Sequence, residues 1–247
     1  MNLFESLGLS EPVKIAVVGA GGKTTVVFQL ARQVKGKAWV TTTTHLGTDQ
    51  LDLADRHFIL DDDGELEPST WLENKVSLLT GDRTPDDRMR GPSSEAMDEI
   101  VKLAGEKRVS VIVEADGARS HPIKAPGENE PVIPPWVDAV IVVIGLSAIG
   151  KTLSAKWVHR PEQFARLSAI PMDNLITLEG TVRMLLDPEG GLKGIPAGSS
   201  KIALFNQADT LTLNASDLLT LHSVHPEYDR VLVAALGKSP TSVQVIP

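Results

Sequence analysis

The sequence contains no cysteine and no long apolar run. Without cysteine, the chain forms no disulfide bond, no thiolate metal site and no cysteine nucleophile. No stretch approaches the roughly 18 consecutive apolar residues of a membrane-spanning helix. Residues 1–6 also lack the basic segment and the apolar segment of a secretory signal peptide. We therefore expect a cytoplasmic protein that has no membrane partner.

Positive charge is scarce, because 24 lysine and arginine residues stand against 32 aspartate and glutamate residues, a formal net charge of −8. This balance argues against general binding to nucleic acids or anionic membranes. Hydrophobic residues make up 42% of the chain and charged residues 23%, as in ordinary globular proteins. The length of 247 residues suffices for one large or two small domains. The acidic turn 61–65 is expected to be a solvated loop.

The most informative stretch is the glycine-rich segment Gly19-Ala20-Gly21-Gly22-Lys23-Thr24-Thr25. It follows the apolar run 13–18 and precedes the apolar-periodic run 26–31, which is the order strand, glycine loop, helix. Glycines let backbone N–H groups turn toward phosphate oxygens, and the start of the helix adds positive potential. Lys23 can then reach the outer phosphates, and the Thr24 hydroxyl can hold Mg²⁺. The segment predicts a nucleotide-phosphate site over residues 19–25.

The spacing of this loop differs from the standard P-loop pattern G-x-x-x-x-G-K-[ST]. Counting back from Gly22-Lys23 puts Val17 where the first glycine would stand, and the loop reads G-x-x-G-K-T-T from Gly19. This short form resembles the loops of Mur-type ligases. It also resembles the P-loop branch that contains metallochaperone GTPases and dethiobiotin-synthetase-like enzymes. An ATP-dependent small-molecule kinase or a Mur-like ligase therefore stays open as an alternative.

Further apolar and β-branched runs predict a mostly parallel sheet. We expect strands at residues 13–18, 37–45, 56–60, 75–80, 109–114, 137–145, 201–206, 228–236 and 242–246. We expect helices at 26–31, 93–103, 177–186 and 210–221, a further helix that starts in 158–164, and a solvated basic loop at 83–92. The predicted fold class is α/β, with helices on both faces in a P-loop NTPase-like three-layer sandwich. The chain would form one domain, 1–247, with an elaborated C-terminal half.

Two carboxylates follow the strand 109–114 at its end, in the run Glu114-Ala115-Asp116-Gly117. The period of two in a strand puts both carboxylates on the same side. In P-loop proteins a carboxylate at the end of a strand beside the loop strand holds Mg²⁺ or its water. Glu114 and Asp116 are therefore candidates for catalysis and for metal binding, together with Lys23 and Thr24. One would contact the Mg²⁺ shell and the other would order water or a switch segment, and either assignment is open.

The strand 201–206 ends in the run Asn206-Gln207-Ala208-Asp209. This run resembles the Asn-Lys-x-Asp element of GTPases, in which the aspartate accepts hydrogen bonds from guanine and the asparagine helps to hold the loop. A carboxylate at that place would not suit adenine, which presents an acceptor at N1. Gln207 replaces the lysine, so stacking on the base would be weaker. Asn206 and Asp209 are the candidates for base recognition, and GTP is favoured over ATP.

Imidazole and basic side chains lie next to two of the predicted strand ends. In open α/β sheets the ligand lies beyond the carboxyl ends of the strands. If the strand 37–45 is parallel to the first strand, its end reaches the nucleotide. The loop 118–126 follows the two carboxylates, where switch or substrate loops usually lie. The candidate substrate contacts are His45, Arg119, His121 and Lys124.

Together these segments resemble the YqeC family, whose members are described as accessory proteins of selenium-dependent molybdenum hydroxylases. The resemblance covers nearly the whole chain, through residues 17–25, 40–45, 113–118, 123–126, 128–134, 159–160, 190–194 and 206–209. It implies a role in maturing a molybdenum hydroxylase, with that enzyme or its cofactor-assembly proteins as the partner. The absence of cysteine argues against thiol-based selenium transfer by this chain.

The sequence thus predicts a Mg²⁺-dependent nucleotide-binding protein or NTPase, with GTP or ATP as the nucleotide, that serves as a maturation factor. Two other classes stay open. A kinase or ligase predicts an acceptor pocket near His45, Arg119 and Lys124, and turnover only when the acceptor is present. A chaperone with a nucleotide switch predicts binding with negligible hydrolysis until its partner is added.

Overall fold

A mostly parallel β-sheet is the central layer of the computed structural model, which describes residues 1–60, 68–238 and 241–247. The strands of this sheet are β1 (Lys14–Gly19), β2 (Ala38–Thr42), β4 (Arg56–Ile59), β5 (Val76–Thr80), β7 (Ser110–Glu114), β9 (Ala139–Gly145), β11 (Ser200–Asn206), β12 (Arg230–Ala235) and β13 (Ser242–Ile246). Their order across the sheet is β13-β12-β11-β9-β1-β7-β2-β5-β4, and β13 runs antiparallel to β12. The acidic turn expected at 61–65 lies outside the described residues.

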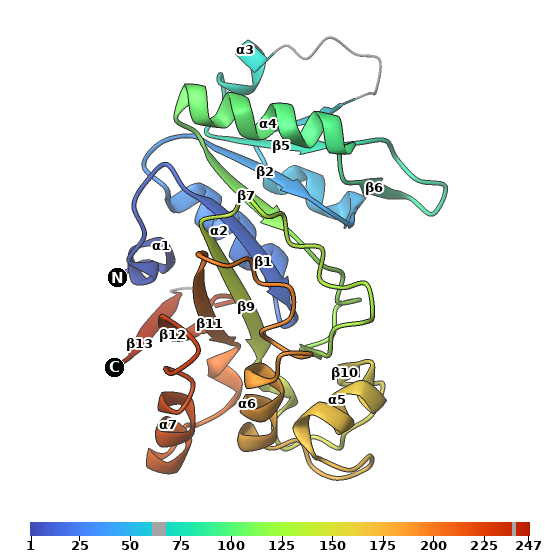
Figure 1. Cartoon of the computed structure of the whole chain (residues 1–247), viewed down its shortest axis with the longest axis vertical. Coiled ribbons are helices and arrows are strands. Elements are labelled where there is room, and N and C mark those ends of the chain that lie inside the picture. The colour runs from blue at the N-terminus through green and yellow to red at the C-terminus, as the bar shows by residue number, and fades with distance from the viewer. Residues whose placement is uncertain (61–67, 239–240) are drawn as a thin grey trace.

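Helices cover both faces of the sheet (Figure 1). The first face carries α1 (Leu3–Leu7) and α2 (Lys23–Gln33), and the second carries α3 (Pro68–Trp71), α4 (Ser94–Lys107), α5 (Pro161–Ser168), α6 (Leu178–Leu186) and α7 (Ala215–His222). Side chains along β9 alternate between the two cores, because Val140 and Val142 face the second set of helices and Ile141 faces the first. Each such buried branched side chain stabilises the fold by about 1.5–3 kcal/mol. The predicted α/β class is confirmed.

The strand that carries the glycine loop lies inside the sheet. β1 pairs in parallel with β7 on one side and with β9 on the other. From β1 the chain runs through α2 to β2, returns to β7 beside β1, and then crosses to β9. Such a reversal of strand order opens a crevice at the carboxyl ends of the strands, where open α/β sheets bind their ligands.

Two short two-stranded sheets lie apart from the main sheet, β3 (His45–Gly47) with β6 (Arg88–Arg90) and β8 (Ile123–Lys124) with β10 (Val158–His159). They correct two predictions. The strand expected over 37–45 ends at Thr42, since the Thr43 N–H donates to Glu114 O at the end of β7 and the chain then turns into β3. The loop expected over 83–92 contains β6. The helix expected to start in 158–164 is confirmed, since α5 starts at Pro161, a residue suited to the first helical position, directly after the short strand β10 and Arg160.

A capping residue decides where α7 begins. The helix expected over 210–221 starts at Ala215, because the Asn214 side chain accepts from the N–H groups of Ser216 and Asp217. The Asp217 carboxylate in turn accepts from the Asn214 N–H, which completes a capping box. The short helix α1 has too few residues to show a helical period, and the sequence does not predict it. Among the described helices, none combines the length and the apolar character that crossing a bilayer requires.

Gly105 allows a direct test of the helical part of this fold. It lies in α4, which continues beyond the expected end at Leu103 to Lys107, and a Cβ at Gly105 would meet no heavy atom within 4 Å. Since glycine costs a helix interior about 0.5–1 kcal/mol relative to alanine, Gly105→Ala should raise the free energy of unfolding by that amount. Urea unfolding measures the change, and a lower stability would contradict this placement of Gly105.

Candidate functional site

The glycine loop joins β1 to α2 in a conformation that requires glycine. Gly19, Gly21 and Gly22 have φ angles of 90°, 88° and 107°, in the left-handed region that side chains disfavour. A Cβ at Gly21 would lie 2.3 Å from the backbone nitrogen of Gly145 at the end of β9. The loop therefore packs against β9 at a distance that no side chain permits, and this packing fixes the start of α2.

The backbone N–H groups of the loop fall into two sets. The first set is held by the protein, because Gly19 donates to Asp116 Oδ2 at 3.0 Å, Ala20 to Val143 O at 2.8 Å and Gly21 to His121 O at 3.1 Å. The second set belongs to residues 22–25, for which the described part of the chain supplies no acceptor, and no side chain caps α2. Unpaired N–H groups at the start of a helix favour an anion there.

Lys23 lies at the start of α2, between Glu114, the last residue of β7, and Asp116, two positions further along the chain. Its Nζ is 3.7 Å from Glu114 Oε1 and 3.2 Å from Asp116 Oδ1. The exposed fractions of the Lys23, Glu114 and Asp116 side chains are 4%, 10% and 4%. Burial raises the pKa of Glu114 above its usual value, and the Lys23 charge opposes that rise. The structure thus brings together the loop lysine and both carboxylates that the sequence pattern selects.

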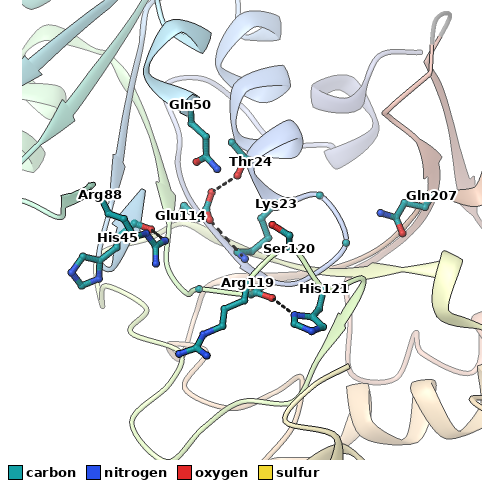
Figure 2. A pocket seen from close by; sticks show the side chains of 14 residues that line it. Lys23, Thr24, His45, Gln50, Arg88, Glu114, Arg119, Ser120, His121 and Gln207 are labelled. Carbon is teal, nitrogen blue, oxygen red and sulfur yellow. Dashed lines mark hydrogen bonds and ion pairs between the residues drawn. The ribbon is translucent and has the colours of Figure 1, made fainter. Parts of the chain in front are cut away.

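A cavity of about 340 Å³ lies over the loop, at the low end of the range of small-molecule sites. Its wall contains eight of the residues selected from the sequence: Gly21, Gly22, Lys23, Thr24, His45, Glu114, Arg119 and His121. Figure 2 shows their side chains together with Gln50, Arg88, Ser120 and Gln207, which sequence reasoning did not select. Residues from five separate segments of the chain therefore share one cavity.

Glu114 and Asp116 have different partners, and Figure 2 shows those of Glu114, which are Thr24 and Lys23. Glu114 Oε2 accepts a hydrogen bond from Thr24 Oγ1 at 3.0 Å, and Glu114 lines the cavity. Asp116 Oδ2 accepts from the Gly19 N–H and lies 3.0 Å from Lys124 Nζ. Of the two carboxylates, only Glu114 belongs to the described cavity wall. A ligand in the cavity therefore meets Glu114, while Asp116 holds the loop from behind.

Gln50 and Arg88 reach the cavity because the chain leaves the main sheet after Thr42. Gln50 lies in the 3₁₀ turn Thr48–Leu53, and its Oε1 is buried with no hydrogen-bond partner in the described residues. Arg88 comes from β6 and donates to the His45 carbonyl at 2.7 Å. The break at the end of β2 places both residues here, and no local sequence pattern marks it.

The turn 118–121 forms the wall opposite α2. The His121 N–H donates to Ala118 O, and Arg119 and Ser120 both have left-handed φ angles, 48° and 60°. Such angles in non-glycine residues cost on the order of 1 kcal/mol each and occur often at functional sites. The ring nitrogens of His121 lie 3.1 Å from Ala118 O and 2.9 Å from Ala155 O. The His121 ring therefore contacts backbone, and Arg119 is the exposed cation of this wall.

Three of the remaining predicted residues, Lys124, Asp209 and Asn206, do not line the cavity. Lys124 is buried, with 1% of its side chain exposed, and does not line the cavity wall described here. Asp209 pairs with Lys238 at 3.6 Å and is likewise absent from that wall. Asn206 donates to Gly21 O at 2.8 Å and accepts from the Leu236 N–H at 3.1 Å, so its amide holds the loop.

His159 is a titratable group beside this site. Its ring stacks on the His121 ring with centroids 5.7 Å apart. Burial first, and then the charges of Arg160, Lys124 and Arg119, lower the pKa of His159 to about 4. The folded protein therefore leaves this ring neutral at pH values where the unfolded chain protonates it.

The lowered pKa predicts a loss of stability in mild acid. Because the folded pKa lies below the unfolded value of about 6.5, the contribution of His159 is complete above pH 6.5 and is lost as the pH falls toward 4. His159→Gln should reduce the fall in the free energy of unfolding between pH 7.5 and pH 5, by about 1 kcal/mol or less since solvent screens the partly exposed ring. Urea unfolding at the two pH values measures this, and an unchanged fall would contradict it.

Comparisons with known proteins give one family. The profile of the family described as YqeC protein matches residues 15–162. A protein of Escherichia coli (strain K12) described as "Uncharacterized protein YqeC" is 33% identical over 200 residues, which cover 79% of this chain and 76% of that protein. No solved structure matches the chain. The matched region contains the glycine loop, both carboxylates and the turn 118–121, and it ends before Asn206.

Proposed function

The chain belongs to the YqeC family, and we propose that it binds a nucleoside triphosphate with Mg²⁺ on the loop 19–25 and hydrolyses it. The observation that carries the proposal is the set of N–H groups of residues 22–25, which have no acceptor among the described residues and belong to the cavity's loop. Lys23 and Thr24 both belong to this set of residues. A phosphate chain is the ligand that such a combination favours.

The donor atoms at this loop suit Mg²⁺. The Thr24 hydroxyl and the Glu114 carboxylate lie 3.0 Å apart, and both are oxygen ligands of the kind that Mg²⁺ takes. The described residues contain no closed group of three histidine or acidic side chains. Magnesium commonly uses one or two carboxylates and completes its shell with waters and substrate phosphates, so an open site is sufficient. When bound, the metal would neutralise charge on the phosphates.

Each residue of the wall has a distinct task in this proposal. The N–H groups of 22–25 orient the phosphates, and Lys23 leaves the carboxylates to contact the outer ones. Glu114 serves the metal together with Thr24, whereas Asp116 stays behind the loop. Gln50, whose side chain lines the cavity, orients the attacking water. Arg119 adds positive charge from the opposite wall.

The choice of base depends on the run 206–209. GTP is the favoured nucleotide because a carboxylate at Asp209 would accept from guanine. In the structure Asp209 pairs with Lys238, so guanine binding requires it to exchange that partner. Gln207, rather than Asp209, lines the cavity. Its Oε1 accepts a hydrogen bond from Ser147 Oγ at 2.6 Å.

At the level of the cell, we propose that nucleotide turnover serves the maturation of a selenium-dependent molybdenum hydroxylase, as the family resemblance implies. A second candidate is transfer to an anionic acceptor, as in a small-molecule kinase or ligase. The observation that favours it is the basic wall of His45, Arg88 and Arg119 across the cavity from the glycine loop. Turnover that requires an added acceptor would identify this second class.

Binding of GTP and of ATP, each with Mg²⁺, tests the central proposal. Titration calorimetry on the purified protein should detect binding of at least one nucleotide, with GTP the tighter. Lys23→Ala should weaken it at least about tenfold, or 1.4 kcal/mol, because the phosphates lose their cation. Lys102→Ala is the matched control, since Lys102 pairs with Glu99 on the exposed face of α4. If neither nucleotide binds the folded wild type, the proposal is wrong.

The assignment of the metal to Glu114 has its own test. Glu114→Gln should raise the Mg²⁺ concentration needed for half-maximal nucleotide binding by at least about tenfold, the scale of loss expected around a metal. Asp116→Asn should leave that concentration nearly unchanged, because Asp116 contacts Lys124 and Gly19 instead. A Mg²⁺ titration at fixed nucleotide measures both. Equal effects of the two substitutions would reject the assignment.

A further inference from the structure

A row of alternating charges leads from the loop lysine through the interior to the partly exposed Arg160. Lys23 pairs with Asp116 at 3.2 Å, Asp116 with Lys124 at 3.0 Å, Lys124 with Glu130 at 2.5 Å and Glu130 with Arg160 at 2.8 Å. The exposed fraction of the side chain is 4% at Lys23 and 1% at Lys124, and it reaches 32% at Arg160 at the outer end. The row therefore joins the nucleotide cavity to the protein surface.

Lys124 is the most deeply buried group of this row, and the proposed reaction does not use it. A buried ammonium group costs several kcal/mol unless oxygens surround it. Here Asp116 Oδ2, Glu130 Oε2 and Gly117 O all lie within 3.0 Å of its Nζ. Glu130 is itself well compensated, since hydrogen bonds from Arg160 and Lys124 lower its pKa to about 2 despite its burial. Lys124 is thus a fixed internal cation that does not itself line the cavity.

This arrangement matters when Lys23 changes partners. Phosphates in the cavity compete with Glu114 and Asp116 for the Lys23 ammonium group. After Lys23 has moved, Asp116 still keeps Lys124 and the Gly19 N–H. Without Lys124, the same movement would leave a buried carboxylate with no cation, which is strongly unfavourable.

We propose that Lys124 is a positioning residue for nucleotide binding, because it compensates Asp116 and so lets Lys23 engage the phosphates. The inference rests on the proposed function. Lys124 also holds Gly117 O, next to the turn that carries Arg119. At the outer end, Arg160 lines a second cavity of about 550 Å³ together with Gln163 and Lys193. A change in the partners of Arg160 therefore alters nucleotide affinity through Glu130 and Lys124.

Nucleotide affinity gives the first test. Lys124→Met removes the charge and keeps most of the length, and it should weaken binding of Mg²⁺ with GTP or ATP roughly tenfold. In an Asp116→Asn background, residue 116 carries no charge that Lys124 could compensate. Lys124→Met should then weaken binding less than about twofold. Lys102→Met is the surface control and should bind as the wild type does. Unchanged affinity of folded Lys124→Met, or equal losses in both backgrounds, would overturn the inference.

Arg160→Met tests the same row at a partly exposed position. Glu130 would then depend on Lys124 alone and draw it from Asp116, so nucleotide binding should weaken about two- to threefold. Wild-type affinity in this variant would overturn the coupling along the row, whatever Lys124→Met does.

A measurement without nucleotide separates this inference from the proposed function. Lys23 and Lys124 both compensate Asp116, so each becomes more important when the other is removed. Lys124→Met should therefore lower the urea midpoint more in a Lys23→Met background than in the wild type. Additive shifts would overturn the inference even if nucleotide binds. The predicted coupling in a protein that binds no nucleotide would leave the charge row intact and reject only the proposed function.

Discussion

The compensation of two buried carboxylates is the interaction on which the site depends. Glu114 and Asp116 end the central strand β7 with at most a tenth of their side chains exposed, and such groups stay charged only beside cations and hydrogen-bond donors. Lys23 at the start of α2 and Lys124 in the interior supply the cations, since both form ion pairs with Asp116. It also holds the glycine loop, because Asp116 accepts from the Gly19 N–H. The contacts of Asp116 thus fix the glycine loop and Lys23 relative to each other.

Close packing of backbone on backbone is the second constraint. Gly21 lies against Gly145 at the end of β9, and the Ala20 and Gly21 N–H groups donate to Val143 O and His121 O. These contacts occupy the N–H groups of Ala20 and Gly21. The N–H groups of residues 22–25 have no acceptor among the described residues, and Gly22, Lys23 and Thr24 line the cavity. The fold therefore separates donors that support the loop from donors that are free for a ligand.

The turn 118–121 connects these two constraints. Only Gly117 separates it from Asp116, and Lys124 donates to the Gly117 carbonyl. The His121 carbonyl of the turn accepts from the Gly21 N–H. Two left-handed non-glycine residues show that the surrounding contacts impose its shape. The turn is therefore the segment that lies between the glycine loop and the charge row. The family match over 15–162 includes all of these parts.

The sequence by itself determined the features that depend on neighbours along the chain. Apolar runs and their periods predict the two-faced sheet, the order strand, glycine loop, helix is local, and Glu114 and Asp116 stand at a strand end by their position alone. The tertiary structure decided which carboxylate faces the cavity, that Lys124 is interior, and that Gln50 and Arg88 reach the wall. It also gave Asn206 its contact with Gly21, 185 positions away in the chain. These outcomes depend on which distant groups compete for the same buried charges and N–H donors, and a local pattern carries no information about that competition.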